Sequence, residues 1–122
     1  DPHFVEEVLT RSREAGQAYL QKLIPLYHVS SIMLFERNKM MLIARGIDST
    51  LPDEALLPPP RDVLLQGFKK GRCFSYGAST KAGQIVYGIT PLSVKGPGRQ
   101  YLLVVGYFLK EDLVKKVQEI SK

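Results

Sequence analysis

The sequence predicts an α+β fold: a five-stranded antiparallel sheet with a long N-terminal helix, a short helix in the connection between strands two and three, and a C-terminal helix. Two patterns lead to this prediction. Apolar residues recur at helical spacing near the start of the chain, and five short apolar runs separated by turn-forming residues follow. With 122 residues, 44% of them hydrophobic and 24% charged, the chain fits one globular domain over residues 1–122.

The first element is expected to be one long amphipathic helix over Phe4–Ile24. Apolar side chains such as Val8, Leu9 and Leu23 fall on one face of this helix, and charged side chains fill the other face. A proline disfavours the helical conformation in the residue before it. Pro25 therefore marks the expected end of the helix.

A β-hairpin is expected next. The apolar runs Val29–Glu36 and Met40–Arg45 flank the turn Arg37-Asn38-Lys39, whose asparagine tolerates a left-handed backbone. Gly46 is expected to close the hairpin.

The connection after the hairpin combines an irregular stretch with a short helix. Residues 47–60 end in the triple proline Pro58–Pro60, which cannot join a sheet ladder. Over Arg61–Lys70, one helical face carries Val63, Leu64 and Phe68, and Gly71 is a natural C-terminal cap. We therefore expect the second helix over Arg61–Lys70.

Three further strands and a last helix complete the prediction. The strands span Arg72–Ser79, Gln84–Val94 and Gln100–Leu109, and the short turns between them imply antiparallel pairing. Residues Lys110–Lys122 place an apolar stripe on one side, with acidic residues first and lysines later, as a helix dipole favours.

Catalytic and metal chemistry are not expected. The single cysteine, Cys73, has no histidine and acid context for nucleophilic catalysis and no second cysteine for a metal site. Neither His3 nor His28 has a second histidine at metal-ligand spacing. We therefore expect a protein that is not an enzyme and that uses no metal and no cofactor.

The charge balance gives weak guidance on partners. Seventeen basic residues against 12 acidic ones give a formal charge of +5. Because the basic residues are spread along the chain rather than interleaved with aromatic residues on one strand face, nucleic-acid binding is not expected.

Residues 71–121, GRCFSYGASTKAGQIVYGITPLSVKGPGRQYLLVVGYFLKEDLVKKVQEIS, carry a family resemblance. The order of strand, turn, strand ending in Pro-Leu, turn, strand with Val-Val-Gly and exit helix resembles the extracytoplasmic PAS-like (Cache) sensor domains of bacterial histidine kinases and chemoreceptors. The resemblance implies a periplasmic domain that passes a small-molecule signal through its terminal helices to flanking membrane helices of a two-component sensor. It leaves the ligand class and the output domain open.

The start of the chain agrees with this expectation. The first residue is Asp1, and the helical pattern is already established by Phe4, so we expect a piece of a longer, membrane-anchored protein. A helix of about six turns also has enough apolar surface to cover its own sheet and pair with a second copy, so a homodimer is expected.

Five residues form the predicted ligand site. Phe74 and Tyr76 share one face of a strand, and Tyr87 lies on the next strand, so the three rings can line one wall of a cavity. Arg45 and Arg72 flank the irregular connection, where a guanidinium can grip a carboxylate. The alternative is that the aromatic residues are ordinary core and that the arginines are solvated strand ends.

A second function stays open beside sensing. The same helix and sheet order also suits a cytoplasmic PAS-like or profilin-like module for protein interaction or dimerisation. Dimerisation without any response to ligands would favour that alternative.

Overall fold

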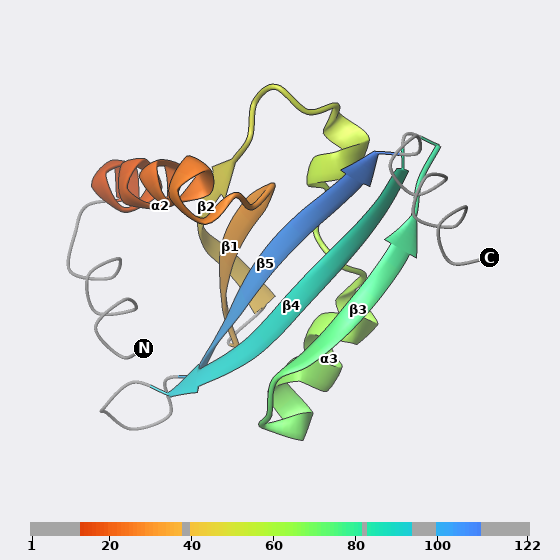
Figure 1. The fold of residues 1–122 in the computed structure, drawn as a ribbon. Coiled ribbons are helices and arrows are strands. Elements are labelled where there is room, and N and C mark those ends of the chain that lie inside the picture. Colours follow the sequence, from red (N-terminus) through yellow and green to blue (C-terminus); the bar gives the residue numbers. More distant parts are fainter. Residues whose placement is uncertain (1–12, 38–39, 82, 94–99, 111–122) are drawn as a thin grey trace.

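The computed structural model describes residues 13–37, 40–81, 83–93 and 100–110 (Figure 1). It is an α+β fold with a five-stranded antiparallel sheet, as the sequence predicts. Four predicted features lie wholly or partly outside the described residues: positions 38 and 39 of the first hairpin turn, the turn over 95–98, the first part of the N-terminal helix, and the C-terminal helix after Lys110. The elements in chain order are α2 (Arg13–Tyr27), β1 (Ser31–Glu36), β2 (Met41–Ile47), η2 (Asp53–Leu56), α3 (Arg61–Lys70), β3 (Phe74–Ser79), β4 (Gly83–Ser93) and β5 (Gln100–Lys110).

The strand order across the sheet is β2-β1-β5-β4-β3. The β1–β2 hairpin and the β3–β4–β5 meander are joined where β1 pairs antiparallel with β5, from Ser31 opposite Gly106 to Glu36 opposite Tyr101. Segments from the two ends of the described chain therefore form the middle of the sheet, and β2 and β3 form its two edges.

Helix α2 packs on one face of the sheet, over β1 and β2 (Figure 1). Leu20 and Ile24 of α2 are buried there against Ile32 and Leu34 of β1. Alternate residues of a strand point to opposite faces, so the neighbouring β1 residues face the other side of the sheet.

Helix α3 and the 3-10 helix η2 cover the opposite face. Val63 and Leu64 of α3 are buried in one cluster with Met33 of β1, Ile89 of β4 and Leu102 of β5. The sheet thus separates two apolar cores, one under α2 and one under α3.

Gly46 lies inside β2, so the prediction that it closes the hairpin is wrong. It pairs with Ile32, and β2 continues to Ile47. A Cβ atom at Gly46 would lie 2.8 Å from the backbone carbonyl carbon and oxygen of Leu20. The glycine is therefore needed where α2 crosses the strand, because any side chain would push the helix away.

The prediction that Pro25 ends the first helix is also wrong. Helix α2 continues to Tyr27, because the burial of Ile24 outweighs the local preference of a residue before proline. The helix then ends in a left-handed residue, His28, with a φ of 56°. The N–H of Val29 donates to the carbonyl of Ile24 at 3.2 Å, which is the long hydrogen bond of a Schellman motif.

The other element boundaries agree closely with the prediction. Helix α3 spans Arg61–Lys70 as predicted, and Gly71 has the left-handed φ of 63° expected of its cap. Strand β3 begins at Phe74 rather than Arg72, and Lys110 ends β5 rather than beginning a helix. The connection after β2 contains η2, which the sequence pattern did not predict.

Candidate functional site

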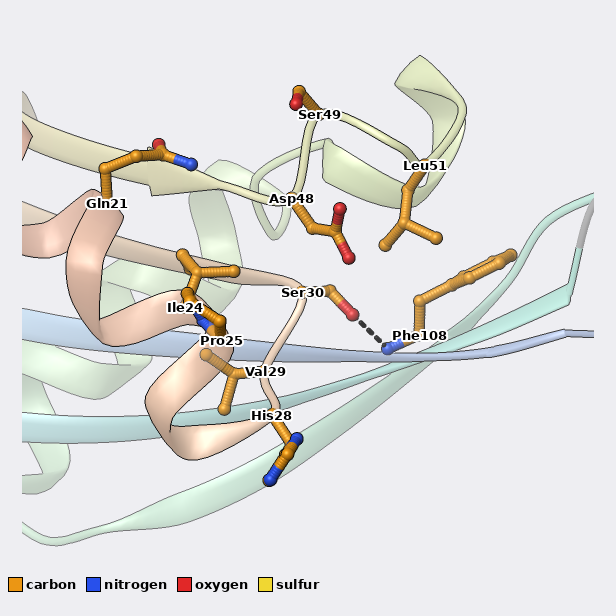
Figure 2. A pocket seen from close by; sticks show the side chains of 10 residues that line it. All are labelled: Gln21, Ile24, Pro25, His28, Val29, Ser30, Asp48, Ser49, Leu51 and Phe108. Atoms are coloured by element: carbon orange, nitrogen blue, oxygen red, sulfur yellow. Dashed lines mark hydrogen bonds between the residues drawn. The ribbon is translucent and has the colours of Figure 1, made fainter.

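A cavity of about 500 Å³ lies where α2 ends and β1 begins (Figure 2). Its ten lining residues come from the C-terminal part of α2, the turn into β1, the loop after β2 and the end of β5. We call this cavity the junction pocket. Its size suits a small organic ligand, and it touches segments from both ends of the described chain.

Ser30 holds the segments around the junction pocket together. Its N–H donates to the carbonyl of Gly106 at 2.8 Å, and its carbonyl accepts from the N–H of Asp48 at 2.9 Å. Its hydroxyl oxygen accepts from the N–H of Phe108 at 2.7 Å. One buried serine therefore joins the start of β1, the loop after β2 and the end of β5.

Asp48 supplies an oriented carboxylate to the junction pocket. Its Oδ1 accepts hydrogen bonds from the backbone N–H of Thr50, at 3.0 Å, and from the Thr50 hydroxyl. These two bonds, the hydroxyl first, hold the pKa of the Asp48 carboxyl below its usual range, so the group is ionised at neutral pH. The N–H of Leu51 donates to the carbonyl of Asp48 at 3.1 Å, which fixes the turn.

Gln21 is committed to the sheet rather than free for a ligand. Its Oε1 accepts from the N–H of Ile47 at 3.0 Å, and its Nε2 donates to the carbonyl of the same residue. The side-chain amide thereby imitates a neighbouring strand at the edge of β2. These two bonds fix α2 to the last residue of β2.

The predicted arginines lie apart from each other and from the junction pocket. Arg45 is exposed on β2 and lines a separate cavity of about 330 Å³ with Gln17 and Leu42. Arg72 is exposed just before β3, which is the opposite edge of the sheet. Since β1, β5 and β4 lie between the two edges, the structure does not bring Arg45 to the aromatic residues of β3.

The predicted aromatic residues do come together. Tyr76 and Tyr87 are paired across β3 and β4, with ring centroids 6.3 Å apart and an angle of 23° between the rings. Phe74 lies on the same face of β3, and the Lys70 ammonium sits 4.8 Å from the centroid of its ring. The three rings lie on the face that α3 covers.

Tyr87 has the properties of a core residue. Its side chain is 2% exposed, and its hydroxyl donates to the carbonyl of Leu57 in the loop between η2 and α3. Burial, with a smaller contribution from Tyr76, raises the pKa of the Tyr87 phenol. Tyr87 therefore fastens the loop over the sheet, and in this structure it lines neither the junction pocket nor the smaller cavity.

Sequence patterns do not single out the residues that shape the junction pocket, namely Ser30, Asp48 and Phe108. An aspartate two residues before a threonine signals a local turn at Asp48, but nothing in that pattern predicts a cavity. Ser30 gave no signal, because a serine before a strand is ordinary and its partners lie far along the chain.

No protein-family model matches the chain, and no curated protein matches it at a significant level. Within residues 13–37, 40–81, 83–93 and 100–110, no helix is long and apolar enough to cross a membrane. The same residues contain no cluster of three or more histidine, cysteine or acidic side chains that could hold a metal ion.

Proposed function

We propose that the chain is the ligand-sensing domain of a membrane-bound receptor of the PAS-like (Cache) type, such as a two-component histidine kinase, and that it works on the extracytoplasmic side. A small molecule occupies the junction pocket and biases the position of α2 relative to the end of β5. The domain itself catalyses no reaction.

The observation that carries this proposal is the place of the junction pocket. An occupant would touch Ile24 of α2, Ser30 before β1, Asp48 after β2 and Phe108 of β5 at the same time. A ligand shifts a conformational equilibrium only through contacts that differ between two states. A pocket shared by four segments supplies such contacts when those segments move relative to one another.

The sheet supports the PAS-like part of the proposal. The five-stranded antiparallel sheet, with a helix-bearing connection between β2 and β3, agrees with the element order on which the resemblance to PAS-like sensors rests. The fold alone does not determine function. The experiments below therefore test ligand binding in the junction pocket.

A thermal-shift screen against amino acids, carboxylates, amines and nucleobases is the first test. A ligand at about 100 times its dissociation constant adds about 2.7 kcal/mol of stability, which is several degrees in a domain of this size. A class of compounds that raises the melting temperature supports sensing. No shift with any class, confirmed by the absence of NMR changes, would contradict it.

The binding site is then located by amide NMR. Binding in the junction pocket should move the amide signals of Ser30, Asp48 and Phe108, whereas binding at the predicted aromatic site should move those of Tyr76 and its neighbours on β3. The two sites are thus separable in one titration.

A pair of leucine variants provides the matched control. Leu51→Ala removes an apolar part of the pocket lining and should weaken binding. Leu57→Ala shortens an exposed leucine on the other side of η2, outside the pocket lining, and should leave binding unchanged. Equal effects from both variants would place the ligand elsewhere.

A second function, a cytoplasmic interaction or dimerisation module, is favoured by one surface. Val86, Tyr107 and Leu109 are 37%, 46% and 37% exposed, and Val86 pairs with Tyr107 across β4 and β5 on the face opposite α3. Analytical ultracentrifugation compares the wild type with Tyr107→Lys, and with Ser75→Lys as a control on the same face. A dimer that only Tyr107→Lys disrupts, in a protein that binds no ligand, would favour this module.

A further inference from the structure

The junction pocket has a one-sided charge. Of its ten lining residues, all of them within the described chain, none is lysine or arginine, and Asp48 is the only acidic one. Figure 2 shows the Asp48 carboxylate pointing toward the space beside Leu51 and Phe108, while the His28 side chain points away from it. With histidine counted as neutral, the pocket presents a single negative charge.

The carboxylate of Asp48 is held in place and keeps an open acceptor. Both bonds from Thr50 go to Oδ1, which leaves Oδ2 with its lone pairs available. The backbone of Asp48 is fixed at both ends, since its N–H donates to Ser30 and its carbonyl accepts from Leu51. A ligand would therefore lose little binding free energy to ordering this acid.

An aromatic ring and apolar side chains complete the pocket. The half-buried Phe108 is anchored through its own N–H to the Ser30 hydroxyl oxygen, and its ring lies across the cavity from Pro25 and Ile24 in Figure 2. An aromatic face attracts a cation, and aliphatic walls favour a hydrocarbon body. A carboxylate or phosphate ligand would instead face Asp48 with no cationic side chain in the lining to offset the repulsion.

We infer that the ligand of the junction pocket is a small organic cation, such as a protonated amine with a compact hydrocarbon body. The ammonium group donates to the Asp48 carboxylate and lies near the Phe108 ring, and the hydrocarbon part packs against Ile24, Pro25 and Leu51. This inference rests on the proposed sensing function and names its ligand class.

Three probes of nearly equal shape but different charge test the inference: cyclohexylmethylamine, cyclohexylmethanol and cyclohexanecarboxylate. Each is titrated into the ¹⁵N-labelled protein at neutral pH, and dissociation constants are taken from the Ser30, Asp48 and Phe108 amides. We expect the amine to bind at least about tenfold more tightly than the alcohol, and the carboxylate to bind most weakly. Added salt should weaken the amine alone.

Asp48→Asn is the decisive variant. Asparagine keeps a carbonyl oxygen that can accept from Thr50, so the turn is preserved while the charge is removed. Amine binding should fall at least about tenfold while alcohol binding is unchanged. Asp53→Asn, which neutralises an exposed acid in η2 outside the pocket lining, should change neither.

The outcomes separate this inference from the sensing function. If the amine binds no better than the alcohol, or if Asp48→Asn leaves its affinity intact, the cation assignment is overturned. Sensing then still stands if another class of compound moves the amides of the junction pocket. If no compound of any class binds the protein, both proposals are wrong.

Discussion

The hydroxyl oxygen of Ser30 accepts a hydrogen bond of 2.7 Å from the backbone N–H of Phe108, 78 residues further along the chain. This bond joins the segment that leaves α2 to the end of β5, and both residues line the junction pocket. A substitution that removes this hydrogen bond is therefore expected to affect both the stability of the fold and ligand binding.

Ser30→Ala is expected to lower the free energy of unfolding by about 1–3 kcal/mol, because it leaves the N–H of Phe108 without its acceptor. Ser49→Ala, an exposed serine of the same pocket, should change stability by less than about 0.5 kcal/mol. Urea denaturation measures both, and faster hydrogen exchange at the Phe108 amide reports the lost bond directly. Equal stability of the two variants would mean that the bond contributes nothing.

Gly46→Ala is expected to destabilise the fold by about 1–3 kcal/mol or more, because the added Cβ meets the backbone of Leu20 at 2.8 Å and that backbone cannot rotate away. Gly88→Ala is the matched control within another strand, since the atom nearest to its Cβ is the carbonyl oxygen of Val105 at 3.9 Å. Chemical denaturation should show a lower free energy of unfolding for Gly46→Ala but not for Gly88→Ala. A tolerated Gly46→Ala would contradict the close packing of α2 on β2.

Tyr87→Phe is expected to cost about 1–2 kcal/mol, because the buried phenol loses its bond to the Leu57 carbonyl while the apolar ring remains. The exposed Tyr107→Phe should be neutral within about 0.5 kcal/mol. Denaturation curves of the two variants test this prediction. A neutral Tyr87→Phe would show that the bond does not hold the loop to the sheet.

The raised pKa of the Tyr87 phenol predicts that the fold loses stability at alkaline pH. The folded-state pKa of Tyr87 is raised, whereas the phenol in the unfolded chain titrates near its ordinary value of about 10. Above that value the unfolded state releases its proton first and is favoured. The contribution of the Tyr87 phenol to the free energy of unfolding is therefore complete below about pH 10. It is lost as the pH rises through the folded-state pKa. The free energy of unfolding is measured against pH for the wild type and both variants. Tyr87→Phe should flatten the decline above about pH 10, and Tyr107→Phe should not.

His28→Gly is expected to raise stability by about 0.5–1 kcal/mol, since glycine adopts the left-handed cap position of α2 without the steric penalty of a side chain. Leu26→Gly, at an exposed position inside the same helix, should instead lower stability by about 1 kcal/mol. Thermal unfolding distinguishes the two. A destabilised His28→Gly would reveal a contact of the imidazole that outweighs the backbone gain.

Local patterns were enough for most elements of the fold. Short apolar runs separated by turn-forming residues predicted all five strands. The helical spacing of Val63, Leu64 and Phe68, with the cap at Gly71, predicted α3 with its observed bounds. These features depend on neighbours within a few residues, which are visible in the sequence. The sequence by itself therefore determined the five strands, their order along the chain, their antiparallel hairpins and α3, but not η2.

The remaining features were decided by contacts between residues far apart in the chain. The pairing of β1 with β5, the need for glycine at Gly46 and the continuation of α2 past Pro25 all depend on what packs against those residues. The junction pocket depends on the same kind of contact, because Ser30 finds Phe108 only after the sheet has closed. Tertiary structure decided these features because burial and long-range hydrogen bonds outweigh local conformational preferences of about 1 kcal/mol.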